Sequence, residues 1–323
     1  MSGQPTREQT VSDTVGAGVT PLGQVAVVVV LYNSASLIPG LVRSLGEGMA
    51  GLAWHLIAVD NASTDGGPAL LRELSPEATV VETGRNAGYA AGINVGVASA
   101  PPHAAVLILN PDVRLTPGCV AELLRAVREP GIGIAVPRLV DAEGELILSM
   151  RREPTLRRAF ADAVLGASRV GRYPTLGEVV TSPHEYEVET VTDWAEGSTQ
   201  LVSADCWAAC GPWDESFFLY SEETDFDLRA RDAGFSTRYV PTARAVHLEG
   251  GSGASPGLRA MMAVNRVRLF RRRNGRVRGG AYWFSILLRE ASRAAIGDRG
   301  SHPTVRALTN PRRFRDVPGP HWL

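Results

Sequence analysis

The chain has 323 residues, of which 44% are hydrophobic and 21% charged, a composition that is typical of a folded globular protein and excludes a disordered or fibrous chain. Its longest aliphatic run, Val25–Leu31, is too short to cross a bilayer, and residues 1–23 lack the apolar core of a signal peptide. We therefore expect a flexible leader there. Three cysteines at spacings that match no zinc or redox motif predict a reducing, cytoplasmic compartment without disulfides.

The charge is distributed unevenly along the chain. All 33 basic residues are arginines, and residues 1–254 carry 18 of them against 31 acids, whereas residues 255–323 carry 15 against 3 acids. An acidic body therefore precedes a basic tail. Such a tail suits an anionic partner, for example a membrane surface, but it is equally what a solvated helical face would look like if it balanced the charge of the body.

Strand-like and helix-like segments alternate four times in the first part of the body. The predicted strands are Val25–Leu31, Trp54–Val59, Thr79–Glu82 and Ala105–Leu109, and the predicted helices are Ser36–Leu45, Pro68–Leu74, Ala90–Ala98 and Thr116–Arg128, with Thr116 as the N-cap of the last. This alternation predicts an α/β fold with a doubly wound, mostly parallel sheet. In such a sheet, the ligand crevice lies at the carboxyl ends of the strands.

The second part of the body is less regular, and the tail is helical. We expect further strands at Ile132–Leu139, Ser236–Val240 and Ala243–His247, helices at Asp205–Cys210 and Asp225–Ala233, a partly ordered excursion at Arg151–Tyr186, and tail helices at about 258–273 and 281–296. The predicted domains are thus a leader (1–23), a catalytic body (24–254, with a nucleotide-binding half at about 24–115 and an acceptor half at about 116–254) and an Arg-rich helical tail (255–323).

Polar clusters follow four of the predicted strands, and two more lie further along the chain. They are Tyr32-Asn33, Asp60-Asn61, Arg85-Asn86, Asn110-Pro111-Asp112, Glu222-Glu223 and His247. Each cluster alone is weak evidence, because an Asp after a strand is most often a turn former or a helix cap. Their joint occurrence in one α/β sheet indicates a site.

The segments VVVVLYN, VDNASTDG, GRNAGYAAGIN, LILNPDV, FFLYSEETDFDLRARDAG and AVHLEGGS, in this order, resemble family 2 glycosyltransferases of the GT-A fold. Within that family, the chain is most similar to bacterial rhamnosyltransferases that use dTDP-L-rhamnose. The resemblance spans Val25 to Gly253. It implies an inverting transfer of L-rhamnose to a hydroxyl of a glycan, or of a glycan linked to a polyprenyl pyrophosphate, during cell-wall or surface-polysaccharide assembly.

The resemblance also implies which residues bind the nucleotide sugar. Asp60 would hydrogen-bond the nucleoside and Tyr32 would pack near the base, while Arg85 would meet the phosphates as a bidentate donor. Tyr32 could instead be a strand-end aromatic that covers the core. The full set implied for the donor is Tyr32, Asn33, Asp60, Asn61, Arg85, Asn86, Gly88, Asn110 and Asp112.

A divalent metal, Mg²⁺ or Mn²⁺, is implied in the same way. The Asp-x-Asp motif of the family corresponds here to Asn110-Pro111-Asp112, so the first acid is missing and Asp112 is left as the main carboxylate ligand. His247 resembles the family's third ligand position, although a lone His is often purely structural. Because Mg²⁺ takes only one or two protein carboxylates plus substrate phosphates, one acid can suffice, and weak metal affinity is expected.

Glu223 is the predicted general base, which would deprotonate the acceptor hydroxyl. Its neighbour Glu222 and three residues of the WAEGS segment, namely Trp194, Gly197 and Ser198, would line the acceptor and the donor sugar. Two alternatives remain open for these residues. Glu222 and Glu223 could only favour the dipole of the helix that they open, and Trp194 could belong to the core.

Single features of the sequence support or oppose each alternative function. A nucleotidyltransferase would carry a Gly-rich loop where Tyr32-Asn33-Ser34 stands, and a catalytically inactive scaffold module is supported only by Asn110. Nucleic-acid binding is not expected, because no aromatic platform accompanies the arginines. The apolar tail residues could instead support peripheral membrane contact, at the inner face of the cell membrane, or a homodimer. These residues are Trp283, Phe284, Ile286, Leu287 and Leu288, beside Arg289 and Arg293.

Overall fold

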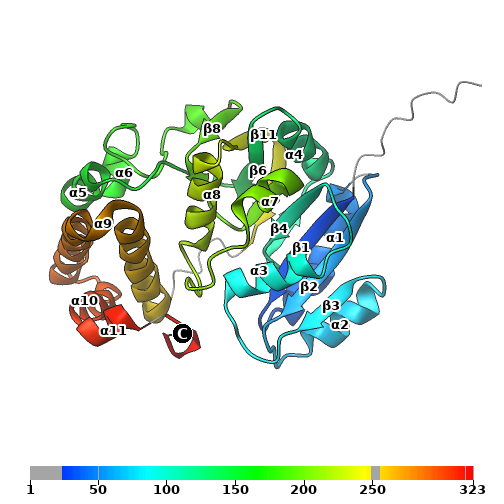
Figure 1. The fold of residues 1–323 in the computed structure, drawn as a ribbon, viewed down its shortest axis with the longest axis horizontal. Coiled ribbons are helices and arrows are strands. Elements are labelled where there is room, and N and C mark those ends of the chain that lie inside the picture. Colours follow the sequence, from blue (N-terminus) through cyan, green and yellow to red (C-terminus); the bar gives the residue numbers. More distant parts are fainter. Residues whose placement is uncertain (1–23, 50, 249–254, 317, 323) are drawn as a thin grey trace, which may run out of the picture.

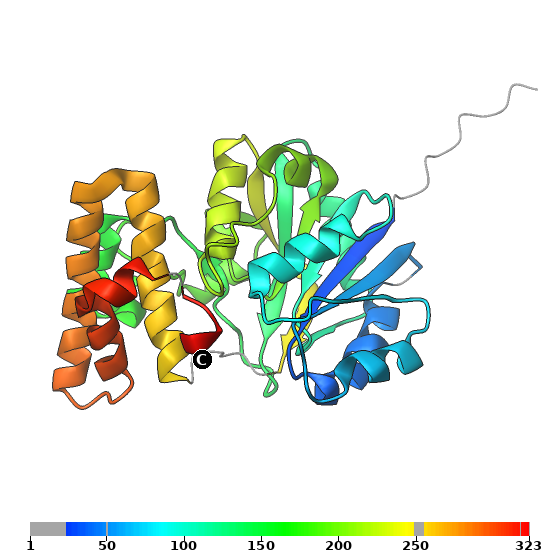
Figure 2. The ribbon, with the colours of Figure 1, turned by 60° about the horizontal axis from the view of Figure 1, so that its bottom comes forward.

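The structure is a computed structural model that describes residues 24–49, 51–248, 255–316 and 318–322 (Figure 1). The predicted leader, 1–23, lies outside the described residues, as do residues 249–254 of the Gly-rich segment after His247. The described chain forms two layers that stand side by side: a sheet with helices on both faces, and a group of carboxyl-terminal helices (Figures 1 and 2).

Within the described residues, the larger sheet has nine strands, in the order β3-β2-β1-β4-β10-β6-β11-β5, with β8 paired to β11. A second, two-stranded sheet joins β7 and β9. The strands are β1 (Val25–Leu31), β2 (Trp54–Asp60), β3 (Thr79–Glu82), β4 (Ala105–Leu109), β5 (Val113–Leu115), β6 (Ile132–Val140), β7 (Met150–Arg151), β8 (Thr190–Thr192), β9 (Trp194–Ala195), β10 (Thr199–Ser203) and β11 (Ser236–His247).

The sheet is parallel in its first half and mixed in its second. Strands β1 to β4 pair in parallel, as expected from the alternating segments, but β10 lies antiparallel between β4 and β6, and β5 and β8 are antiparallel to β11. The chain reaches β10 after a long excursion, so no short βα connection fixes its direction. The segments expected as two strands at Ser236–Val240 and Ala243–His247 form the single strand β11, with an irregularity between Val240 and Arg244.

Two hydrophobic cores lie on the two faces of the sheet, which explains why β1 is apolar throughout. Val25, Val27 and Val29 point into one core, while Ala26 and Val28 point into the other. Successive side chains of a strand face opposite sides, so a strand that is covered on both faces has no polar position. The ends of β1, β2 and β4 are thereby held rigidly at one edge of the sheet.

Helices cover both faces of this sheet (Figure 1). The helices with side chains in the first core are α1 (Ile38–Gly48), α2 (Gly67–Leu74) and α4 (Cys119–Val127), and those with side chains in the second are α3 (Tyr89–Ala98), α7 (Ala204–Cys210) and α8 (Glu222–Asp232). Helix α4 begins later than expected, and Thr116 is not its N-cap. The Thr116 hydroxyl instead donates to the carbonyl of Arg244 in β11, at 2.8 Å.

The excursion between β6 and β10 is better ordered than its sequence indicates. It contains α5 (Leu156–Leu165), α6 (Ala167–Val170) and the 3-10 turn η2 (Pro183–Tyr186). Arg152, which is 9% exposed, donates to the carbonyls of Gly171 and Gly177, at 3.0 and 3.2 Å. A buried guanidinium therefore ties together a segment that lacks hydrophobic periodicity.

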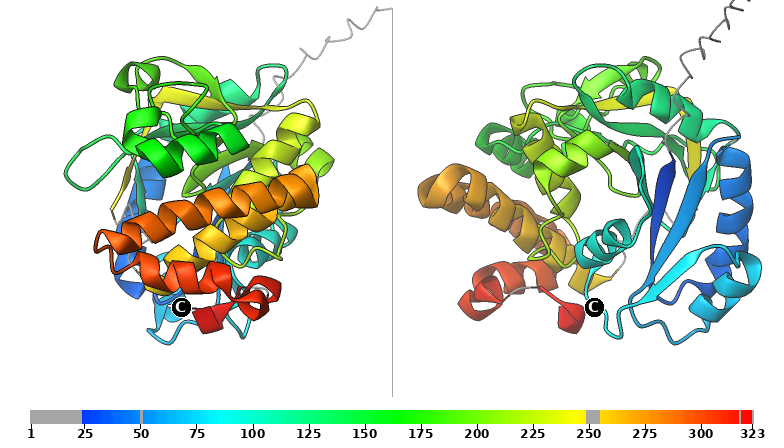
Figure 3. Two further views of the ribbon diagram at one scale, coloured as in Figure 1. Left: turned by 90° about the vertical axis from the view of Figure 1, so that its left-hand side faces the viewer. Right: turned by 45° about the vertical axis from the view of Figure 1, so that its right-hand side comes forward.

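The carboxyl-terminal layer is built on a helical hairpin, as Figures 2 and 3 show. Helix α9 (Pro256–Ala295) is broken at Gly275, whose φ of 81° lies outside the helical region, so its two arms correspond to the two helices expected from the sequence. Phe270 and Tyr282 stack across the arms, with ring centroids 4.1 Å apart. Helices α10 (Ser301–Thr309) and α11 (Pro311–Arg315) and the turn η3 (Pro320–Trp322) complete the layer.

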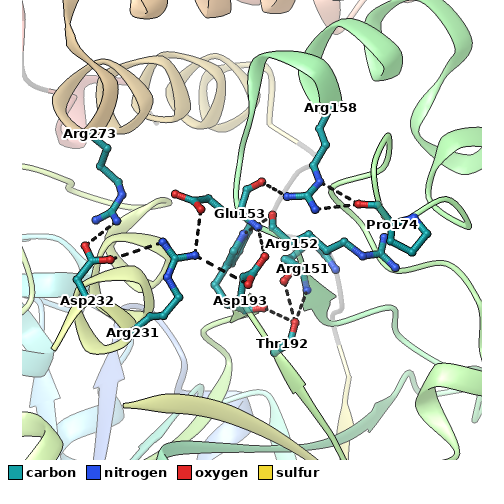
Figure 4. A network of polar contacts seen from close by, with 11 residues as sticks. Arg151, Arg152, Glu153, Arg158, Pro174, Thr192, Asp193, Arg231, Asp232 and Arg273 are labelled. Atoms are coloured by element: carbon teal, nitrogen blue, oxygen red, sulfur yellow. Dashed lines mark hydrogen bonds and ion pairs between the residues drawn. The ribbon is translucent and has the colours of Figure 1, made fainter. Parts of the chain in front are cut away.

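Ion pairs join the hairpin to the body, as Figure 4 shows for one network. Arg273 of α9 contacts Asp232 at 2.7 Å, Asp232 also contacts Arg231, and Arg231 reaches Glu153 at 3.0 Å. Part of the tail's positive charge is thus paired with acids of the body. Among the five apolar tail residues expected at a membrane, Ile286 is 3% exposed, whereas Phe284 and Leu288 are 52% and 38% exposed. No described helix is long and apolar enough to cross a membrane.

Candidate active site

The ends of β1 and β2 are joined by hydrogen bonds between the turns that follow them. Asp60, at the end of β2, is 3% exposed and accepts from the backbone N–H of Ser63 at 3.1 Å. The backbone N–H of Asn33 donates to the Ser63 hydroxyl at 2.9 Å, and the Asn33 side chain accepts from the N–H of Thr64 at the same distance. The structure therefore brings Asn33 and Asp60 together at the carboxyl edge of the sheet.

The neighbouring residues extend this cluster toward α3. Asn61 is buried and donates to the carbonyl of Gly88 at 2.9 Å, while Asn86 accepts from the Gly88 N–H at 3.1 Å. Arg85 is exposed, and Tyr32 is 47% exposed, so both side chains are accessible to a ligand. The 47% exposure of Tyr32 disagrees with the alternative that it covers the core.

Tyr89, the first residue of α3, connects this edge to β4. Its hydroxyl donates to the Asn110 side chain at 2.7 Å, and its backbone N–H donates to the carbonyl of Phe218 at 2.8 Å. Burial, together with the carboxylates of Glu222 and Asp112, holds the pKa of the Tyr89 phenol well above its usual value of 10. The phenol is therefore a neutral hydrogen-bond donor beside several acids.

Asp112 and His247 meet from different parts of the chain. His247 ends β11, which pairs with β5 directly after Asp112, and its Nε2 lies 3.2 Å from Asp112 Oδ2. The His247 Nδ1 lies 3.3 Å from Glu196 Oε1. Burial alone would lower the pKa of His247, but the contacts with Asp112 and Glu196 outweigh it and raise the pKa to about 9.

This pair could hold a divalent cation, which would have to displace the proton that His247 carries at neutral pH without metal. Asp112 Oδ1 is buried and makes no hydrogen bond within the described part of the chain, so a carboxylate oxygen is available as a ligand. The described residues contain no group of three or more His, Cys, Asp or Glu that could hold a metal ion. A site of one carboxylate and one imidazole would therefore depend on substrate phosphates for its remaining ligands, as Mg²⁺ and Mn²⁺ sites often do.

Glu222 and Glu223 open α8 beside these groups. The two preceding residues, Tyr220 and Ser221, have positive φ angles of 68° and 77°, which are costly for residues other than glycine. Glu222 is 2% exposed, and its Oε2 is buried without a hydrogen bond in the described structure. Glu223 is half-buried. The strained turn thus presents two acids at one helix start.

The environment of Glu223 differs from that of a surface acid. Burial, and secondarily the carboxylate of Glu196, raises the pKa of Glu223 to about 7. Gly197 allows the close approach of this side chain, because a Cβ at position 197 would lie 3.0 Å from Glu223 Cβ. A carboxylate with a pKa near neutrality is well matched to proton transfer at physiological pH.

A pocket of about 530 Å³ runs from these acids toward the carboxyl-terminal helices. The predicted site residues that line it are Asn110, Trp194, Gly197, Ser198, Glu222, Glu223 and His247. Trp194 donates from its Nε1 to the carbonyl of Arg152 at 3.2 Å, and its ring lies under the Arg151 guanidinium. The side chain is therefore part of the pocket wall and not of a core.

The structure arranges the predicted residues in two adjoining groups. One is the strand-end cluster around Asp60, and the other is the pocket around Glu223; Asn110 joins them through Tyr89. Sequence reasoning missed Tyr89 and Glu196, although both lie inside quoted segments, GRNAGYAAGIN and WAEGS. It also missed five charged pocket residues for which no sequence signal existed. These are Arg151, Asp162, Glu178, Arg266 and Arg289.

Comparison with known proteins shows the family of the chain. Residues 26–175 match the model of the glycosyl transferase family 2. The chain is 30% identical over 278 residues to the N-acetylglucosaminyl-diphospho-decaprenol L-rhamnosyltransferase of Mycobacterium tuberculosis, which covers 81% of this chain and 87% of the relative. It is also 27% identical to a low-salt glycan biosynthesis hexosyltransferase of Haloferax volcanii, over 71% of this chain and 68% of the relative.

A solved structure with a similar fold is the mannosyltransferase PcManGT from Pyrobaculum calidifontis, in complex with GDP-Man and Mn²⁺. It superposes with a TM-score of 0.56 at 18% identity and covers 92% of this chain and 83% of the mannosyltransferase. At this identity the likeness concerns the fold alone. It agrees with the expected GT-A architecture of a sheet with flanking helices.

Proposed function

Because the chain belongs to glycosyl transferase family 2 and is a glycosyltransferase, we propose that it transfers L-rhamnose from dTDP-L-rhamnose to a hydroxyl of a lipid-linked glycan. The observation that carries this proposal is the common pocket of Glu223 and His247, with Asp112 3.2 Å from His247. A base and a site for a leaving diphosphate thus adjoin one space. The M. tuberculosis relative, named for a rhamnosyl transfer to a diphospho-decaprenol sugar, supports the donor and the acceptor class.

In the proposed mechanism, Glu223 accepts the proton of the acceptor hydroxyl. As that proton leaves, the hydroxyl oxygen attacks the anomeric carbon, and the bond from this carbon to the diphosphate breaks. The attack from the opposite face inverts the anomeric configuration, and the nucleoside diphosphate departs with the bonding electron pair. The pKa of about 7 keeps a substantial fraction of Glu223 ionised at neutral pH, while leaving it basic enough to accept a proton.

The surrounding residues hold the reactants in place. Asp60 and Asn33, joined through Ser63 at the strand ends, would contact the nucleoside, and exposed Arg85 would meet the phosphates as a bidentate donor. Asp112 and His247 would hold a divalent cation, which supplies positive charge to the departing diphosphate when bound. Trp194 offers an apolar face on which a sugar ring could stack.

A screen of donors with the purified protein tests the proposal. The full chain is incubated with Mn²⁺ or Mg²⁺, a polyprenyl-diphosphate-linked N-acetylglucosamine and one of dTDP-L-rhamnose, UDP-N-acetylglucosamine or GDP-mannose, and the lipid product is analysed by mass spectrometry. We expect a mass increase of one deoxyhexose with dTDP-L-rhamnose only, and loss of the product with EDTA. Transfer from another donor, with none from dTDP-L-rhamnose, would refute the donor assignment.

Contact with a membrane and dimer formation stay predictions. The membrane prediction now depends on a smaller set of side chains than the sequence indicated, since Phe284 and Leu288 are exposed but Ile286 is buried. Co-sedimentation with anionic vesicles measures it directly. An F284S/L288S variant should bind these vesicles less than the wild type, and equal binding would contradict a contact through this helix face.

A further inference from the structure

One end of the catalytic pocket is formed by arginines of the helical hairpin. Arg266 on the first arm of α9 and Arg289 on the second both line the pocket that contains Glu223. Their side chains are only 24% and 19% exposed. Arg151 of β7 lines the same pocket and lies with its guanidinium 5.8 Å from the Trp194 ring centroid.

Three acids, namely Glu178, Asp162 and Glu290, accompany these arginines but do not use all of the hydrogen-bond donors of the two guanidinium groups. Arg266 contacts Glu178 at 2.6 Å, and Arg289 contacts Asp162 at 3.4 Å. A guanidinium carries five N–H donors, and one carboxylate contact leaves several of them available. The Nε of Arg289 and the Oδ1 of Asp162 are buried and make no hydrogen bond within the described residues.

The charges at this end of the pocket favour an anion. Three guanidinium groups, from Arg151, Arg266 and Arg289, line the pocket together with the carboxylates of Asp162 and Glu178. The buried acid Glu290, whose Oε1 lies 3.9 Å from Arg289 Nε, is shared with a fourth guanidinium, from Arg293, at 3.8 Å. Inside a half-buried pocket, an unbalanced positive charge attracts an anion more strongly than it would at the surface, because the effective dielectric constant is lower. The planar guanidinium also matches the geometry of a phosphate, which it binds through two parallel hydrogen bonds.

We propose that Arg266 and Arg289 bind the diphosphate of a lipid-linked acceptor whose sugar extends to Glu223. This inference rests on the proposed function and deepens it, because it assigns the acceptor's charged linkage to residues of the carboxyl-terminal hairpin. The diphosphate would contact the donors that Asp162 and Glu178 leave free. The donor's own diphosphate would lie elsewhere, at Asp112 and His247, so the protein would hold two separate diphosphates during transfer.

A binding experiment without turnover tests this subsite. Farnesyl diphosphate, a short prenyl diphosphate without a sugar, is titrated calorimetrically into the full chain in the presence of a saturating nucleoside diphosphate, which occupies the donor side. We expect R266Q and R289Q each to weaken binding by about 10- to 100-fold, the usual value of a charge-assisted hydrogen bond. D162N should strengthen binding, because it releases the Arg289 guanidinium.

The control is R273Q. Arg273 lies on the same helix, is 20% exposed and pairs with Asp232 at 2.7 Å, but it does not line the pocket. Its substitution should leave farnesyl diphosphate binding unchanged. If R289Q alone fails to fold, the D162N/R289Q pair removes both charges together and should still show the weakened binding.

Three outcomes would overturn the assignment of Arg266 and Arg289 to the diphosphate. They are unchanged binding in R266Q and R289Q, an equal loss in R273Q, and a D162N variant that binds no better than the wild type. Inorganic pyrophosphate that binds as tightly as farnesyl diphosphate would overturn the lipid-linked assignment in favour of a free phosphate. Because the titration needs no sugar transfer, a chain that binds the probe as expected but transfers no rhamnose contradicts the proposed function and leaves the subsite standing.

Discussion

The two sides of the candidate site are built in different ways. The proposed donor side, which adjoins the pocket, consists of turns that directly follow parallel strands, and its residues, such as Asp60 and Asn33, are joined by local hydrogen bonds. The opposite side combines a strand, a helix of the excursion and both arms of α9, and ion pairs such as Arg266–Glu178 join them. The donor side is therefore fixed by the sheet, whereas the opposite side depends on how the helical layer docks.

Replacing Glu223 by Gln should reduce the rate of transfer more than substitutions of Gly197 or of the hairpin turn. Glu223 lies where the two sides of the site meet. We expect kcat to fall by about 10²- to 10⁴-fold, because the amide cannot accept the proton of the acceptor. Nucleoside diphosphate binding should be unchanged, since the donor side is built separately. Stopped or continuous assays of transfer, with calorimetry for nucleotide binding, measure the two quantities. Full activity in E223Q would remove Glu223 from its role.

We also expect E223Q to change the stability of the folded protein in a pH-dependent way. The folded-state pKa of Glu223, about 7, lies above its ordinary value of 4.5, so the folded protein binds more protons than the unfolded chain between these two pH values. Stability is therefore lost as the pH rises from 4.5 to 7, and the loss persists above 7. E223Q should melt at a higher temperature than the wild type at pH 8, and this difference should shrink at pH 5.

Substitution of Gly197 by Ala should cause the next largest decrease in kcat. The new Cβ would lie 3.0 Å from Glu223 Cβ, so the Glu223 side chain must shift. We expect kcat to decrease by at most about 10-fold, because the required shift is a few tenths of an ångström, well below the displacement of about 1 Å that can cost about 100-fold. Gly46→Ala, at an exposed position of α1 where a Cβ meets nothing within 4 Å, is the matched control and should retain full activity.

The pH dependence of transfer should report the titration of Glu223. Because the base must be ionised, kcat/KM should rise about tenfold per pH unit below 7 and level off above it, in line with the pKa of about 7. The profile is measured at saturating metal, in buffers of constant ionic strength. A flat profile between pH 5 and 8 would contradict a base with this pKa.

Substitutions in the hairpin turn should change stability and leave the chemistry intact. Gly275 has a φ of 81°, so Gly275→Ala should lower the free energy of unfolding by about 1 kcal/mol. Gly280→Ala, inside the second arm where a Cβ meets nothing within 4 Å, should act in the opposite direction by a similar amount. Urea unfolding measures both. Equal effects of the two substitutions would contradict the break in α9.

Substitutions in the ion-pair network of Figure 4 should change the free energy of unfolding least. The Arg273–Asp232 contact is 2.7 Å long, but the Asp232 side chain is 53% exposed, and such pairs contribute about 0–1 kcal/mol. A double-mutant cycle of R273Q and D232N should therefore yield a coupling free energy below about 1 kcal/mol, decreasing with salt. A larger coupling would mean that this pair is a main determinant of how the hairpin docks.

The comparison between the two sides also explains what the sequence could predict. The β1 and β4 segments are continuous apolar runs, and β2 contains the shorter run Leu56–Val59; each is followed by polar residues, so a short stretch contains both the strand and the turn expected to meet the ligand. Glu223 and His247 were predicted as site residues from the resemblance to the family, and the structure places both at one pocket. The contact between Asp112 and His247 depends on the pairing of β5 with β11, and no local sequence pattern indicates this pairing.

The opposite side of the pocket could not be predicted for a physical reason. Arg266 and Arg289 are two of many arginines in the tail, and only the break at Gly275 and the packing of α5 against α9 decide which of them face the pocket. The direction of β10 was likewise open, because a long excursion precedes it. Residues whose role depends on the docking of distant elements leave no periodicity or spacing to recognise.

The break in α9 has a consequence for biosynthesis. A ribosome makes the chain from the amino end, so the strands and Glu223 emerge well before Arg289, which must fold back past Gly275 to meet Asp162. The strand-end turns therefore leave the ribosome before the far side of the pocket exists. In the proposed function, transfer would require the returning arm, because Arg289 lines the pocket that contains Glu223.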